Sequence, residues 1–303
     1  MKLKSTFAAP ILVIFVMLMF TASRYIDIGS LSYRENICLA IIVLQLLILV
    51  VPSAFYTKIR GDGFIKKMRL APIGIEKLLL TLLAAFVLIL GDTLLKLALY
   101  NIGFIDAEYS LYYYYLDGTS PGVLYSLIAF AVVPSVCEEL MFRSLLCAEY
   151  ESSGTVTAVI ASSMLYAMFG MNFGYFPVYL FAGLMFALVM YITRSVFASM
   201  LCHLCYSVFE LAAGETVRTI ITKPQSTGFL IFAVAGTFLL ALAALFGEAE
   251  RTYYGYALSG KRAEYAEKCP RFNLRLFSQA LLAPPFLVAL LVFIIAAIQF
   301  SGV

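Results

Sequence analysis

The chain has 303 residues, of which 63% are hydrophobic and 13% are charged, with a formal net charge of +3 and a mean hydropathy of +0.95. Soluble domains carry about a quarter charged residues and fewer apolar ones, so this composition excludes an ordinary soluble globular protein. It predicts an all-α fold, a polytopic transmembrane helical bundle of about eight or nine spans.

Apolar stretches with few or no charges succeed one another along the sequence, and one transmembrane helix needs roughly 20 apolar residues. The stretches lie at about 7–22, 37–57, 78–100, 118–137, 152–193, 195–209, 226–247 and 276–303. The stretch at 152–193 is long enough for two helices, and the Asn, Gly and Pro residues between Asn172 and Pro177 divide it. Together the stretches predict about nine spans.

The first stretch has two interpretations. Lys2 and Lys4 precede an apolar run that ends at Phe20, and the small residues Thr21-Ala22-Ser23 follow. This order is typical of a secretory signal with a cleavage site, and also of a signal anchor that stays in the membrane. We favour the retained anchor, because cleavage sites are weak patterns, and in both cases residues 24–36 lie outside.

Charges in the connecting segments predict the orientation of the bundle. The connections at 57–77 and 248–279 are both rich in Lys and Arg, so we expect both on the cytoplasmic side. The connection at 100–120 has three acidic residues, no Lys or Arg, and a run of tyrosines that suits a membrane interface. We therefore expect it outside.

The sequence divides into three parts. Residues 1–117 are N-terminal transmembrane helices, residues 118–213 are a core with the candidate site, and residues 214–303 are C-terminal transmembrane helices with a basic connection. We expect a multi-pass integral membrane protein, located in the cell membrane if the source is bacterial.

The core carries three ionisable residues in an otherwise apolar helix: Glu138, Glu139 and Arg143. Charges at membrane depth cost several kcal/mol unless they are paired or hydrated, so they predict a functional site. Residues four apart stack on a helix, so Glu139 and Arg143 can form an ion pair, whereas Glu138 points about 100° away. Pro134 removes one helix hydrogen bond and favours a kink beside the acids. Glu138 is then a candidate general base or acid; the alternative is a buried pair that only fixes helix packing.

His203, the only histidine of the chain, is the second candidate. Its helix begins near Ser195, which puts His203 roughly 12 Å into the membrane, and Glu138 lies roughly 15 Å from the end of its own helix. The two groups can therefore meet at one depth. Ser207 stacks one turn beyond His203 and can present its hydroxyl to the same pocket.

Several short motifs follow one another between residues 120 and 210. They are Glu138-Glu139-x-x-x-Arg143, an aromatic segment from Ser162 to Gly170, Phe181-Ala182-Gly183-Leu184, and Thr193-Arg194-Ser195-Val196 leading to His203-x-x-x-Ser207. Their order and spacing resemble the CPBP family of intramembrane proteases, which includes CAAX prenyl endopeptidases and bacteriocin-processing or immunity proteins. The resemblance implies an all-helical membrane core with a catalytic cavity open toward the cytoplasm.

The resemblance also implies a role for each candidate residue. Glu138 is the base that activates a water, Glu139 and Arg143 are a structural pair, and His203 and Ser207 form the oxyanion side. The chain departs from the family pattern twice, because Gly170 stands where the second motif has a histidine and Ser207 replaces an amide. Loss of an acid–base partner costs about 10²–10⁴-fold in rate, so a weak peptidase and a non-catalytic member both fit the sequence.

Two other patterns have structural interpretations. Cys202-His203-Leu204-Cys205 suggests a metal site, but one imidazole leaves the usual tetrahedral set short, and cysteines inside spans usually pack as apolar residues. We predict no tightly bound metal and no cofactor. Asp92 and Lys96 are spaced for an ion pair within one helix, for which we favour a structural role over a place in the cavity.

Three hypotheses of function follow. The first is an endopeptidase that acts on a peptide or a membrane-associated protein in the lipid bilayer. The second is a catalytically impaired member that binds a peptide or partner protein, as an immunity or scaffold protein does. The third is a transporter with an intramembrane ion relay, which the absence of an internal repeat disfavours. We expect no nucleic-acid partner, and the sequence leaves the oligomeric state open.

Overall fold

The structure is a computed structural model, which describes residues 5–26, 33–65, 67–105, 122–222, 227–259 and 272–300. The regular elements in these ranges are all helices, which confirms the all-α class. Up to residue 105 they are α1 (Ser5–Ser23), α2 (Arg34–Gln45), η1 (Leu46–Val50), α3 (Val51–Arg60), α4 (Asp62–Ile65), η2 (Ile75–Lys77) and α5 (Leu78–Asn101). From residue 122 they are α7 (Val123–Leu127), η3 (Ile128–Val132), α8 (Val133–Glu139), η4 (Leu140–Leu146), α9 (Cys147–Tyr150), η5 (Glu151–Ser153), α10 (Thr155–Phe169), α11 (Phe176–Thr193), α12 (Val196–Ile221), α13 (Thr227–Leu258), α14 (Leu274–Leu281) and α15 (Pro284–Phe300).

Within the described ranges, seven helical stretches are long and apolar enough to cross a membrane. The pair α14 and α15, bent by 49°, makes an eighth if it is taken as one span. Helix α10 has 15 residues and falls short of a full span, which accounts for the ninth predicted one. The predicted break between Asn172 and Pro177 is confirmed, since α10 ends at Phe169 and α11 begins at Phe176. The chain is a multi-pass integral membrane protein.

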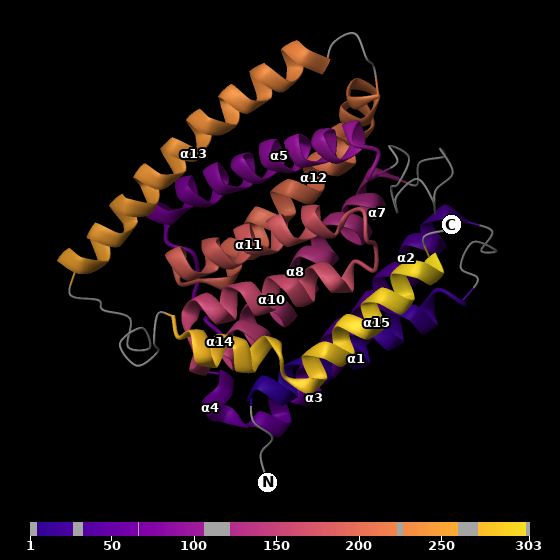
Figure 1. Cartoon of the computed structure of the whole chain (residues 1–303), viewed down its shortest axis with the longest axis vertical. Helices are drawn as coiled ribbons and strands as arrows, with labels where there is room; N and C mark the ends of the chain where they lie inside the picture. The colour runs from indigo at the N-terminus through magenta and orange to yellow at the C-terminus, as the bar shows by residue number, and fades with distance from the viewer. Residues whose placement is uncertain are drawn as a thin grey trace.

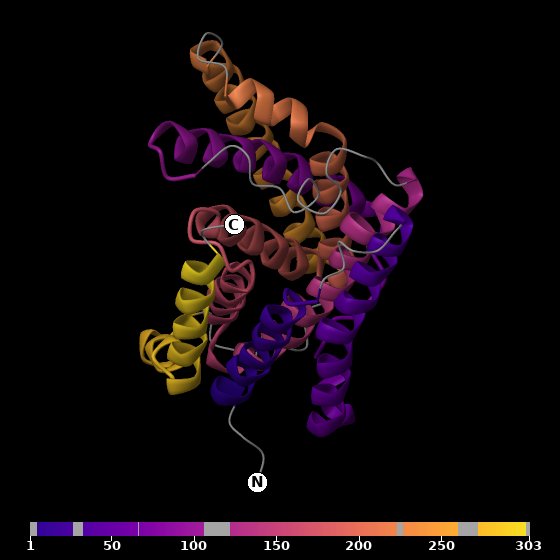
Figure 2. The ribbon, with the colours of Figure 1, turned by 90° about the vertical axis from the view of Figure 1, so that its right-hand side faces the viewer.

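Helices α5, α10, α11 and α12 lie side by side in the middle of the bundle (Figure 1). The span that carries the acids, from α7 to η5, packs against α10 and α12. Helix α13 runs along α5 at one edge (Figure 1), whereas α15 packs against α1 on the other side of the bundle (Figures 1 and 2). Only 6% of the apolar window of α13 is buried, so most of its apolar surface is left to face lipid.

Helix α1 supplies part of the main core. Ala9, Val13, Val16 and Met17 are fully buried in it, and the helix contacts α15 and α9. Helix α1 thus adds apolar burial to the core of the bundle.

The helix with the acids contains two wide π-helical segments. Segment η3 ends at Val132, just before Pro134, and η4 begins at Leu140, just after Glu139. Pro134 lies in the first turn of α8, where its missing N–H costs least. Such π segments are frequent at functional sites. The irregularity predicted at Pro134 therefore takes the form of π-helical turns on both sides of the acids.

Ion pairs join the helices at their predicted cytoplasmic ends. Arg60 of α3 binds Glu149 of α9 through two nitrogens, each 2.6 Å from a carboxylate oxygen. The Tyr56 hydroxyl donates to the same carboxylate at 3.0 Å. Arg69, in the segment between α4 and η2, pairs with Glu151 of η5. These pairs tie α3 and the segment that follows it to the end of the acid-bearing span.

Replacing Glu149 by glutamine is expected to lower the free energy of unfolding by about 2 kcal/mol, because the Arg60 guanidinium stays mostly buried and loses its counter-charge. Thermal unfolding in detergent, followed by far-UV circular dichroism, measures the effect. Glu248→Gln is the matched control, since its partner Arg251 is 79% exposed and such surface pairs contribute little. Equal unfolding temperatures for the two variants would contradict this prediction.

Candidate active site

Two membrane spans supply the candidate residues: the acid-bearing span and α12. Glu138 and Glu139 end α8, Arg143 follows in η4, and His203 and Ser207 lie on α12. Glu139 and Arg143 are fully buried, His203 is 4% exposed and Ser207 is 9% exposed. Glu138 is only half-buried. The two neighbouring glutamates thus have different surroundings, as the 100° rotation per residue predicts.

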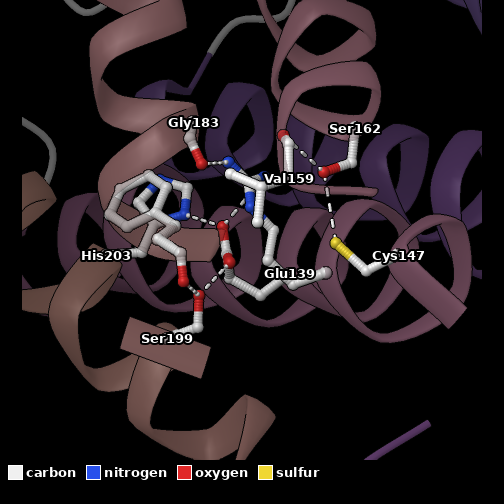
Figure 3. A network of polar contacts seen from close by, with 9 residues as sticks. Glu139, Cys147, Val159, Ser162, Gly183, Ser199 and His203 are labelled. Carbon is white, nitrogen blue, oxygen red and sulfur yellow. Dashed lines mark hydrogen bonds and ion pairs between the residues drawn. The ribbon is translucent and has the colours of Figure 1, made fainter. Parts of the chain in front are cut away.

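Glu139 is the centre of a polar network (Figure 3). Its Oε1 lies 3.3 Å from Nη1 of Arg143 and 3.1 Å from Nδ1 of His203. The Ser199 hydroxyl contacts the other carboxylate oxygen, Oε2, and lies 3.1 Å from the carbonyl oxygen of Phe186. The predicted ion pair between Glu139 and Arg143 is therefore present. A fully buried carboxylate is tolerated here because a cation, an imidazole and a hydroxyl surround it.

Arg143 is held on several sides. Its guanidinium carbon lies 4.2 Å from the ring centre of Tyr166 and 5.1 Å from that of Phe186. Its Nη2 donates to the carbonyl oxygen of Gly183 at 3.2 Å. A cation over aromatic faces in a desolvated site gains about 2 kcal/mol per good contact. Arg143 therefore links the acid-bearing span to α10 and α11 as well as neutralising Glu139.

His203 has one defined orientation. The Phe186 ring stacks on the imidazole, with centroids 4.5 Å apart and planes at 20°, and Tyr166 approaches it edge-on at 6.5 Å. Because a carboxylate only accepts hydrogen bonds, Nδ1 facing Glu139 carries the proton. The second nitrogen, Nε2, is then the one left for a substrate or a water. A carboxylate that orients an imidazole in this way is a recurring arrangement in hydrolytic sites.

His203 lies near both acids, at the common depth that the sequence predicts, and its nitrogen bonds to Glu139. Glu139 points toward Arg143 and α12, and the side chain next to it in sequence cannot take the same direction.

Glu138 remains outside this hydrogen-bonded network. It forms no ion pair within the part of the chain that the structure describes, although His203 and the Tyr166 hydroxyl are among its polar neighbours. The residue as a whole is partly exposed. Ser207, one turn beyond His203, likewise makes no hydrogen bond to any described residue. These are the properties expected of groups that await a substrate.

Gly170 has its side-chain space filled by another residue. A Cβ atom built at this position would lie 2.4 Å from the ring of Tyr179, far inside van der Waals contact. Position 170 is thus closed to a histidine unless Tyr179 moves. The sequence shows that position 170 lacks the histidine, but it does not show that the Tyr179 ring occupies that space, because Tyr179 belongs to the next helix.

Sequence reasoning also missed the residues that support the site from other helices. Ser199 lies four residues before His203, so the serine stripe on α12 could have indicated it. Phe186 and Gly183 carry no such signal. In the described ranges, no group of three or more His, Cys, Asp or Glu side chains is placed to hold a metal ion.

A family model described as Type II CAAX prenyl endopeptidase Rce1-like matches residues 120–209. The match confirms that residues 120–209 resemble the CPBP family. It covers less than a third of the chain but contains every candidate residue from Glu138 to Ser207. No curated protein and no solved structure matches the chain.

Proposed function

We propose that the protein is an intramembrane endopeptidase that hydrolyses a peptide bond in a membrane-associated substrate. The observation that carries the proposal is that the two glutamates have different surroundings. Glu139 is fully buried and contacts Arg143, His203 and Ser199, whereas Glu138 is half-buried and forms no ion pair with a described residue. A carboxylate without an ion-pair partner, near an oriented imidazole, suits general acid–base catalysis of peptide hydrolysis.

In this proposal Glu138 accepts a proton from a water that attacks the scissile carbonyl. The attack forms a C–O bond and moves the carbonyl π electrons to oxygen. When the oxyanion re-forms the carbonyl, the C–N bond breaks, its electron pair stays on nitrogen, and Glu138 gives its proton to the leaving amine. His203 forms the oxyanion side: once Nε2 also carries a proton, it donates to the oxyanion while Nδ1 stays bonded to Glu139. The Ser207 hydroxyl is a second donor on the same side of α12. Arg143 takes no part in the bond changes and keeps Glu139 in place.

The experiment is cleavage of membrane-anchored candidate peptides by purified protein in lipid nanodiscs. Wild type is expected to cleave at least one of them, and Glu138→Gln is expected to lose about 10²–10⁴-fold in rate. Glu76→Gln, an acid exposed before α5, is the control and should cleave as wild type does. Unchanged cleavage by Glu138→Gln would rule out its role as the base.

One observation favours a second function, that of a non-catalytic member that binds a peptide or partner protein. The Tyr179 ring closes the space beside Gly170, so no second histidine can assist Glu138. If this function holds, a bound peptide should be retained equally by wild type and Glu138→Gln, with no turnover in either. Hydrolysis by wild type that is lost on mutation of Glu138 would exclude it.

A further inference from the structure

A second group of buried charges lies between α5 and α12. Lys96 Nζ is 2.7 Å from Oδ2 of Asp92 and 2.9 Å from Oε2 of Glu210. The other oxygen of Asp92, Oδ1, accepts a hydrogen bond from the Tyr206 hydroxyl at 2.9 Å. The predicted pair of Asp92 and Lys96 is present, and α12 adds two partners that the sequence did not reveal. These four residues are called the α5–α12 cluster below.

The α5–α12 cluster determines how the two helices face each other. The Asp92 side chain is 2% exposed and that of Lys96 is 16% exposed, so neither can exchange its partners for water at low cost. The ion pairs of the Lys96 ammonium persist when its carboxylate partners shift slightly. A phenol hydrogen bond is more demanding, since it requires about 2.5–3.0 Å between oxygens and a nearly linear geometry. Tyr206 therefore restricts rotation of α12 about its own axis.

This rotation controls the position of His203. Tyr206 and His203 are three residues apart, on one face of α12. Phe186 touches both rings, stacking on the imidazole at 4.5 Å and meeting Tyr206 at 6.5 Å. A rotation of about 20° moves a side chain that lies about 5 Å from the helix axis by about 2 Å. Such a movement would break the 3.1 Å contact between His203 and Glu139.

We infer that the α5–α12 cluster positions His203, with Tyr206 as the positioning residue. By holding Asp92, Tyr206 keeps α12 in the rotation in which Nδ1 of His203 faces Glu139. No hydrogen bond between described residues joins the cluster to the Glu139 network, so the cluster acts through helix orientation and not by proton transfer. The effect on catalysis rests on the proposed function, whereas the orientation of the imidazole does not.

The test is Tyr206→Phe, which removes the hydroxyl and keeps the ring against Phe186. Because His203 is the only histidine, protein with isotope-labelled histidine gives one imidazole signal by NMR in nanodiscs. Wild type should show Nδ1 protonated, and Tyr206→Phe should show a mixture of the two tautomers. With a cleavable peptide, kcat should fall about 10-fold at unchanged KM, because the imidazole is misplaced while substrate binding is not.

Tyr191→Phe is the matched control. The Tyr191 hydroxyl donates at 3.0 Å to Glu151, which pairs with Arg69 and contacts no member of the α5–α12 cluster, so both variants lose a phenol–carboxylate bond. We expect similar stability in both and a changed imidazole signal only in Tyr206→Phe. An unchanged signal, or the same change in both variants, overturns the inference.

If Tyr206→Phe does not fold, Glu210→Gln replaces it, since this carboxylate is 33% exposed and its loss should shift the imidazole signal in the same direction. Absence of cleavage by wild type counts against the proposed function alone, because the imidazole signal still decides whether the cluster positions His203.

Discussion

Replacing Arg143 by methionine is expected to lower the free energy of unfolding by about 3–5 kcal/mol. The guanidinium and the Glu139 carboxylate are both fully buried and 3.3 Å apart, so the substitution leaves the carboxylate without its main counter-charge. It also removes the cation over the Tyr166 ring and the donor to the Gly183 carbonyl. Denaturant titration in detergent, followed by far-UV circular dichroism, measures the loss.

The double variant Glu139→Gln with Arg143→Met separates charge from packing. Removing both members of a buried ion pair is often tolerated where removing one is not, so the double variant should be more stable than Arg143→Met. Ser144→Ala is the control at the next position, since it breaks a single neutral hydrogen bond to Met68 and should cost about 1 kcal/mol. Wild-type stability in Arg143→Met would contradict the view that this ion pair holds the site together.

Replacing His203 by glutamine is expected to lower kcat/KM by about 10²–10⁴-fold. Glutamine has an amide donor but cannot be protonated, and it cannot keep the stacked orientation that Phe186 gives the imidazole. Steady-state kinetics on a peptide that wild type cleaves measures the change.

The control for this prediction is Cys205→Ala. Cys205 is half-buried on the same helix, about 200° around the axis from His203, and should leave kcat/KM unchanged. Full activity in His203→Gln would show that the imidazole is not needed for cleavage. Glu138 would then be the one proposed catalytic group.

The features that sequence predicts well here depend on local spacing. The apolar stretches fix where helices lie, and the Asn, Gly and Pro residues near 172–177 mark the turn between α10 and α11. The ion pairs of Glu139 with Arg143 and of Asp92 with Lys96 follow from residues four apart on a helix. Each of these needs only the helical period, which is the same in every sequence context.

Contacts between helices depend on packing that the helical period does not encode. The depth argument put His203 and the acids at similar levels, but neighbouring residues differ by only about 1.5 Å along the axis. It could not tell Glu138 from Glu139 as the partner. Glu210, Tyr206 and Tyr179 were missed for the same reason, since each meets its partners across a helix interface.

The most direct measurement compares Glu138→Gln with Glu139→Gln in two assays, peptide cleavage and denaturant unfolding. Glu138→Gln should lose cleavage and unfold within about 1 kcal/mol of wild type, because its carboxylate forms no ion pair with a described residue and glutamine can still accept a hydrogen bond from Tyr166. Glu139→Gln should be clearly less stable, because Arg143 and His203 both lose their charged partner. Wild-type cleavage by Glu138→Gln, or wild-type stability of Glu139→Gln, would contradict the separate roles assigned to the two glutamates.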